Sequence, residues 1–188
     1  MGALGAAYLT GPDEADINLA VVLATRHRLE QLGATVVMTR TDDLTEDTKL
    51  TIYDRREMAD ALKPDLFLSI HHNSAPLTGD LNKADWMEAY YHEASAAAFA
   101  EKLMEILPET LGRKGSAAAR DRYYVTRMTY SPAVLLELGY IVNPAQYEDC
   151  CDTISIFKSA CSISRAILDM IPQADTEQQA AEGSGQNG

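Results

Sequence analysis

The apolar positions of the chain fall into short runs that alternate with longer segments of helical period. Two of the short runs also carry an ionisable residue: the run 65–71 ends in His71, and the run 134–143 contains Glu137. Short apolar runs bounded by turn residues are typical of buried strands. Strands that alternate with helices predict an α/β layered domain with a mainly parallel central sheet flanked by helices.

The boundaries of these elements follow from proline, glycine and acidic residues. Pro12, Asp13 and Glu14 favour the start of a helix that stops at Gly33. Further helices are predicted over 49–62, 94–107, 144–150 and 153–171, strands over 35–39, 66–71, 87–92, 123–126 and 134–138, and a basic loop over 114–122. The resulting domain covers residues 1–172. The segment 173–188 is polar without apolar period, so we expect a disordered tail there.

Composition narrows the range of partners. The 188 residues suit one domain, and the net charge of −12 argues against nucleic acid or an anionic membrane surface as a partner. No run approaches the ~18 apolar residues of a membrane span, and we expect no signal peptide within these residues. The three cysteines, two of them adjacent, form a poor disulfide framework, so we expect packed, inert thiols at Cys150, Cys151 and Cys161.

Glu137 and His71 are the residues with the clearest chemical potential. Burying a lone carboxylate costs several kcal/mol unless it is paired, protonated or near a metal ion. His71 and His72 are neighbours on a strand, so only one of them faces a given site. In α/β sheets, ligands gather beyond the carboxyl ends of the strands. Two strand ends that carry a His and a Glu therefore predict a metal-assisted hydrolytic site. The alternatives are a structural Glu137 paired with an arginine such as Arg40 or Arg127, and a hydrogen-bonded His71.

Five segments carry a family resemblance, and they occur in the same order as in that family. They are Glu14–Leu19, the stretch from Gly33 to Thr39-Arg40-Thr41-Asp42, Arg55–Ala59, Ser69-Ile-His71-His72-Asn73 and Leu136–Asn143. Together they resemble the zinc-dependent N-acetylmuramoyl-L-alanine amidases of bacterial cell-wall turnover. The resemblance covers residues 2 to about 149.

The resemblance implies a function and roles for three residues. Glu14 and His71 correspond to zinc ligands, and Glu137 corresponds to the catalytic general acid and base. The substrate would be peptidoglycan or muramyl peptides, cleaved between N-acetylmuramic acid and L-alanine, and the parent protein would act outside the cytoplasm, in the cell wall or periplasm. For Glu14 a simpler role stays open, because an acidic residue in the first turn stabilises a helix on its own.

One departure from the family lies at the start of the chain. The family begins with a strand ending in Gly-His-Gly-Gly, whose His is the first zinc ligand, whereas this chain opens at Met1 and holds no His before His27. We expect that the first strand and ligand are missing, that activity is low, and that an unpaired sheet edge favours self-association. The alternatives are an inactive, metal-free peptidoglycan-binding or regulatory module of the same fold, and a zinc hydrolase of another amide.

The segment 173–188 generates a first prediction. Because it lacks an apolar period, deleting it should leave the melting temperature nearly unchanged, as measured by circular dichroism of the full and shortened chains. A large drop in melting temperature would show that the segment packs on the domain.

Overall fold

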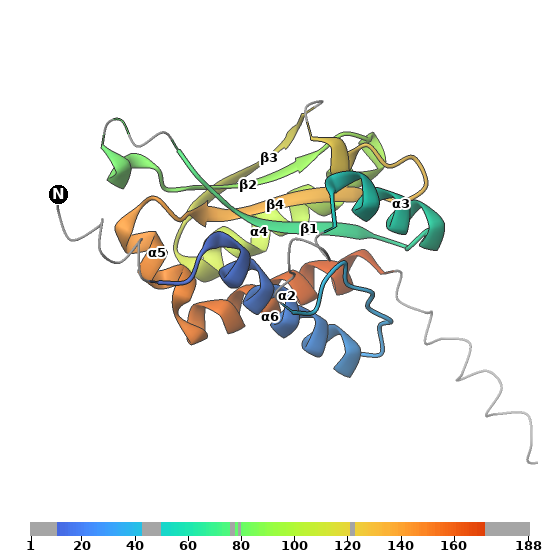
Figure 1. Ribbon diagram of the computed structural model, residues 1–188, viewed down its shortest axis with the longest axis horizontal. Helices are drawn as coiled ribbons and strands as arrows, with labels where there is room; N and C mark the ends of the chain where they lie inside the picture. Colours follow the sequence, from blue (N-terminus) through green and yellow to red (C-terminus); the bar gives the residue numbers. More distant parts are fainter. Residues whose placement is uncertain (1–10, 43–49, 76–77, 79, 121–122, 172–188) are drawn as a thin grey trace, which may run out of the picture.

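The computed structural model describes residues 11–42, 50–75, 78, 80–120 and 123–171, and its centre is a four-stranded sheet (Figure 1). The strands are β1 (Phe67–Asn73), β2 (Trp86–Tyr91), β3 (Lys114–Ala119) and β4 (Ala133–Tyr140), in the order β1-β4-β2-β3. β1 pairs with β4 in parallel, and so does β2 with β3, whereas β2 and β4 are antiparallel. The prediction of an α/β fold with a mainly parallel sheet is confirmed.

Three long helices cover one face of this sheet. They are α2 (Glu14–Gln31), α4 (Ala97–Leu111) and α6 (Thr153–Met170), drawn below the sheet in Figure 1. The main core lies between them and the strands, and it includes Val21, Ile70, Met87, Phe99, Leu103, Leu136, Leu138 and Ile163. Burial of this layer stabilises the fold, by about 25 cal/mol per Å² of apolar surface removed from water.

The opposite face is covered near the start of β1. There α3 (Ile52–Leu62) and the short helix η3 (Tyr124–Thr126) lie over the sheet, and Ala59, Met128, Ala133 and Phe67 form a small apolar cluster. α5 (Pro144–Cys151) follows β4 at the other end, and the remaining short helices are η1 (Leu81–Lys83) and η2 (Ala94–Ala96).

The period of two in the strands separates apolar from polar positions. In β4, Val134, Leu136 and Leu138 join the core under the helices, which leaves Glu137 on the opposite face. In β1 the same alternation buries His72, at 4% exposure, and exposes His71. The prediction that the two histidines face opposite ways is confirmed.

Three predictions of local structure were wrong. Residues 35–39 belong to no strand among the described residues, since β-branched residues form a strand only where a partner strand pairs with them. Residues 114–119 of the predicted loop form β3, because pairing with β2 outweighs the weak strand propensity of Gly115 and its neighbouring alanines. The predicted strand 123–126 is instead the helical turn η3.

The predicted helix end at Pro108 was wrong as well. α4 continues past Pro108 to Leu111 and ends at Gly112, whose φ of +64° is the left-handed cap that glycine adopts most readily. A proline removes one hydrogen bond of a helix. Because Pro108 lies in the last turns of α4, the helix continues past it to Leu111.

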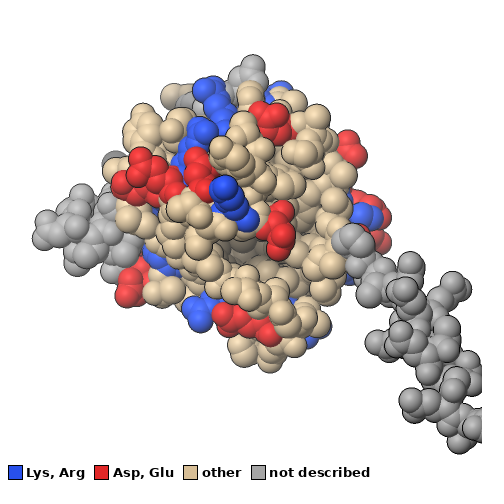
Figure 2. Space-filling view, turned by 90° about the vertical axis from the view of Figure 1, so that its right-hand side faces the viewer, with Lys and Arg blue, Asp and Glu red and all other residues tan. Residues whose placement is uncertain are grey.

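The face of the molecule beside α3 has neither a basic nor an acidic patch. Lys and Arg lie intermixed with Asp and Glu there, so the net negative charge does not gather into one patch on this face (Figure 2). None of the helices in the described part of the chain is both long and apolar enough to cross a membrane.

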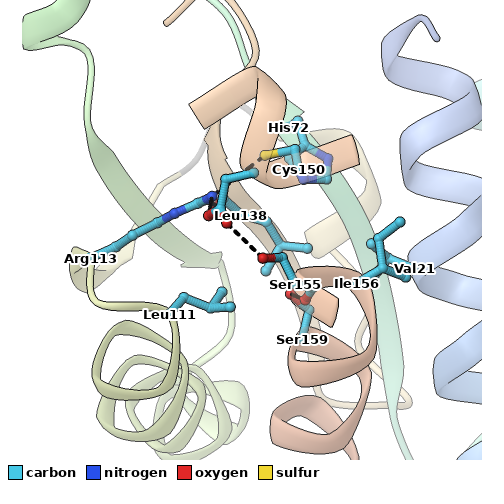
Figure 3. A pocket seen from close by; sticks show the side chains of 10 residues that line it. Val21, His72, Leu111, Arg113, Leu138, Cys150, Ser155, Ile156 and Ser159 are labelled. Carbon is cyan, nitrogen blue, oxygen red and sulfur yellow. Dashed lines mark hydrogen bonds and ion pairs between the residues drawn. The ribbon is translucent and has the colours of Figure 1, made fainter. Parts of the chain in front are cut away.

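A buried arginine fixes the carboxyl end of β4. The Arg113 guanidinium donates to the Leu138 carbonyl, pairs with Asp149 and lies against the Cys150 sulfur (Figure 3). Its side chain is 8% exposed, so these partners replace the water that it has lost. Gly139 lies directly against this group with a φ of +139°, a conformation that L side chains rarely adopt.

We therefore expect Gly139→Ala to lower the free energy of unfolding by about 2–4 kcal/mol. A Cβ at this position would lie 2.5 Å from both Arg113 Nη1 and Gln146 Oε1. Gly112→Ala is the matched control, because its φ is also positive but no atom lies within 4 Å of the added Cβ, and it should lose about 1 kcal/mol. Equal losses in urea unfolding of the two variants would contradict the steric argument.

Candidate functional site

A row of three ionisable side chains crosses the sheet on the face opposite the long helices. His71 of β1 is the register partner of Glu137 of β4, and Glu137 is in turn the register partner of Glu88 of β2. Residues paired in this way point to the same face and lie about 5 Å apart at their Cβ atoms. The sheet therefore holds one imidazole and two carboxylates side by side.

Glu14 reaches this row from the first turn of α2. Asp13 caps the helix and exchanges hydrogen bonds with Asp16, so the capping role does not require the Glu14 side chain. Glu14 Oε1 instead lies 2.9 Å from His71 Nδ1 and accepts from the His72 backbone N–H at 3.4 Å. The alternative of a purely helix-stabilising Glu14 does not account for this contact across 57 residues of sequence.

A second layer of polar groups holds Glu14 in place. Asn18, one helical turn on, donates from Nδ2 to Glu14 Oε1 at 3.0 Å, and its Oδ1 lies 2.7 Å from His72 Nδ1. Burial, assisted by the charge of Arg113, lowers the pKa of His72 to about 4, so this imidazole is neutral and suits a supporting role. Burial also acts to raise the pKa of Glu14, but hydrogen bonds from His71 and Asn18 outweigh it, and the pKa falls below its usual value.

The pKa of Glu137 is shifted in the opposite direction from that of Glu14. Burial raises the pKa of its carboxyl group to about 7; the charge of His71 acts against this, while Glu14 and Glu88 add to it. Its Oε2 atom is buried without a hydrogen-bond partner among the described residues. A carboxyl group poised near neutral pH with an unused oxygen is suited to taking and returning a proton.

Glu88 completes the row and was not among the predicted site residues. Its Oε2 accepts from Asn73 Nδ2 at 3.3 Å, and its carboxylate hydrogen-bonds with the Tyr90 hydroxyl. The signal that identified Glu137, an acidic residue inside an apolar strand, is also present in the run Trp86–Tyr91, where it was not used. Asn18 and His72 were likewise not assigned a role.

The donor atoms at Glu14 and His71 are compatible with one metal ion. A carboxylate oxygen and an imidazole nitrogen are ligands that zinc takes, and these two already face each other at 2.9 Å. The described residues contain no group of three or more His, Cys, Asp or Glu placed to hold a metal ion. The two side chains therefore supply part of a ligand set.

The histidine on the other face belongs to a different environment. His72 lines a small pocket with Arg113, Cys150 and residues of α2 and α6 (Figure 3). The alternation along β4 places Glu137 on the other face of the sheet. Cys150, Cys151 and Cys161 are free thiols, and burial raises the pKa of Cys150. Arg113 and Cys150 lie at the end of β4, whereas His72 supports Glu14 through Asn18.

Comparisons with known proteins identify a matching family and related proteins. The sequence profile of the N-acetylmuramoyl-L-alanine amidase family matches residues 2–169. A Staphylococcus aureus protein named "Probable cell wall amidase LytH" is 38% identical over 136 residues, which is 70% of this chain. The chain spans 40% of the length of that relative.

Solved structures of amidases share the fold. The catalytic domain of CwlV, an N-acetylmuramoyl-L-alanine amidase from Bacillus (Paenibacillus) polymyxa var. colistinus, superposes with a TM-score of 0.76 at 30% identity, with 89% of each chain covered. The amidase AmiC2 of Nostoc punctiforme has the same TM-score at 27% identity, with 86% of each chain covered.

The raised pKa of Glu137 predicts how stability depends on pH. The folded pKa of about 7 lies above the ordinary value of 4.5, so between these values the unfolded chain releases a proton that the folded chain retains. The free energy of unfolding should therefore fall as pH rises through this window, by about 1–3 kcal/mol.

Glu137→Gln removes the titrating group and tests this. The variant should match the parent chain near pH 4.5 and exceed its stability by about 1–3 kcal/mol at pH 8, in urea unfolding with a chelator present. Glu101→Gln, at an exposed position on α4, is the control and should follow the parent at both values. An identical pH dependence in the parent and Glu137→Gln would contradict the burial of this carboxyl group.

Proposed function

Because the chain belongs to the N-acetylmuramoyl-L-alanine amidase family, matched over residues 2–169, we propose that it hydrolyses the amide between N-acetylmuramic acid and L-alanine in peptidoglycan. The observation that carries the proposal is Glu137: a carboxyl group with a raised pKa and an unpartnered oxygen, next to the Glu14–His71 pair. A structural glutamate would be expected to have both oxygens paired.

Glu14 and His71 are the residues that would hold zinc. When bound, zinc polarises a carbonyl oxygen and makes water a stronger acid, which is the chemistry that amide hydrolysis at neutral pH requires. Asn18 and the backbone N–H of His72 fix the carboxylate of Glu14, and neutral His72 fixes Asn18 in turn. Second-layer partners of this kind set the orientation of metal ligands.

Glu137 carries out the proton transfers. Its carboxylate accepts a proton from the attacking water and then donates it to the nitrogen of the leaving amine. A pKa of about 7 suits both steps at neutral pH, because neither form of the group is strongly favoured. Its place between His71 and Glu88 in the ladder keeps it next to the metal-binding pair.

A metal-free binding or regulatory module is the second candidate. The observation that favours it is the incomplete ligand set, since Glu14 and His71 are two ligands and catalytic zinc usually takes three from protein. Such a module would still bind muramyl peptides on the same face. Zinc content and turnover, measured on one preparation, separate the two candidates.

The substrate also sets the compartment. The relative from Staphylococcus aureus is named as a cell wall amidase, and peptidoglycan lies outside the cytoplasmic membrane. We accordingly propose that the protein acts in the cell wall or periplasm.

The test is the release of free amino groups from an N-acetylmuramoyl peptide, with zinc added and after treatment with a chelator. Glu137→Gln should lower kcat by about 10²–10⁴-fold while zinc content is unchanged, because it removes proton transfer but no ligand. His71→Ala should lose both zinc and turnover, measured by atomic spectroscopy and amine release.

Glu101→Gln serves again as the matched control and should retain full activity. Cleavage that persists undiminished in a chelator would exclude the zinc mechanism. Binding of muramyl peptides without cleavage, at any zinc concentration, would support the second candidate instead.

A further inference from the structure

The side of the active site beyond Glu137 is built around Glu88. In the ladder that places His71 against Glu137, the next register partner is Glu88 of β2, so the order across the sheet is imidazole, carboxyl, carboxyl. The row continues to Ser116 of β3, beside Trp86, which is 39% exposed. This part of the face is accessible to a ligand.

The Glu88 carboxylate is held in one orientation from two sides. Asn73, at the end of β1, donates to Oε2 at 3.3 Å, although β4 lies between β1 and β2 in the sheet. Tyr90 is a buried residue, 3% exposed, and its hydroxyl hydrogen-bonds with the same carboxylate. Two carboxylate oxygens offer about four acceptor positions, so these two donors leave capacity for a third.

The proposed chemistry decides which part of the substrate lies there. The acyl carbonyl belongs next to the Glu14–His71 pair, and the amide nitrogen must come within hydrogen-bond reach of Glu137 to receive its proton. Since the nitrogen side of the substrate is the side nearer Glu137, the peptide that leaves continues along the row towards β2. Its first groups beyond the nitrogen are those of L-alanine.

We propose that Glu88 is a substrate-binding residue on the leaving-group side, which accepts a hydrogen bond from the N–H that follows L-alanine and excludes a free carboxylate at that position. This inference rests on the proposed function. It predicts that the protein distinguishes a muramoyl-alanine unit that continues as a peptide from one that ends there. An amide N–H is attracted to a fixed carboxylate, whereas a terminal carboxylate is repelled by it.

The experiment compares two ligands that differ at this position alone, N-acetylmuramoyl-L-alanine amide and N-acetylmuramoyl-L-alanine with its free carboxylate. Dissociation constants are measured by calorimetry, and turnover is followed in the same samples with zinc present. The parent chain should bind the amide at least about tenfold more tightly than the acid, because the two differ in both charge and donor.

Glu88→Gln keeps the shape and an acceptor oxygen but removes the charge, so the preference for the amide should fall to about threefold or less. Glu88→Ala should weaken binding of the amide as well, because the acceptor is lost. Glu101→Gln changes the net charge equally on the other face of the molecule and should keep the full preference.

The outcomes separate this inference from the proposed function. A preference for the amide that is absent in the parent, or unchanged in Glu88→Gln, overturns the role of Glu88 even when both ligands are cleaved. A preference that depends on Glu88 without any turnover supports the inference as a binding property and counts against hydrolysis. Failure to bind either ligand overturns both.

Discussion

A carboxyl group in an interior strand of a sheet is the constraint on which the rest of this site depends. Glu137 lies on β4, which has hydrogen-bonded neighbours on both sides, and burial there opposes ionisation. The fold lowers this penalty by placing the group on the face that the long helices do not cover. His71 on one side favours the ionised form and Glu88 on the other opposes it, so the group is balanced between two protonation states.

The same constraint explains the supporting structure at the carboxyl ends of β1 and β4. At β1, the first turn of α2 brings Glu14 to His71, with Asn18 and His72 behind. At β4, the ion pair of Arg113 and Asp149 ties the strand end to α5. Neither group contributes a large apolar area. Their effect is to reduce the number of positions that Glu137 and its neighbours can occupy.

The features that were predictable from sequence are those with strong local signals. β1, β4 and α4 have apolar faces, capping residues mark the start of α2, and an acidic residue inside the apolar run of β4 distinguishes Glu137. β3 was missed because Gly115 and three successive alanines have little strand propensity, and it forms through pairing with β2. Glu88 carries the same signal, an acidic residue inside an apolar run, but its place opposite Glu137 depends on the antiparallel register of β2, which the sequence does not reveal.

The strand order has a consequence for synthesis on the ribosome. β1 and β2 follow each other in the chain but are separated in the sheet by β4, which is made last of the four strands. Until residues 133–140 have left the exit tunnel, β1 and the β2–β3 pair have no common neighbour. Contacts between residues so distant in sequence also form slowly. In a nascent chain Glu14 and His71 are therefore synthesised early and belong to elements that contact each other directly, whereas Glu88 joins them only after β4 has formed between β1 and β2.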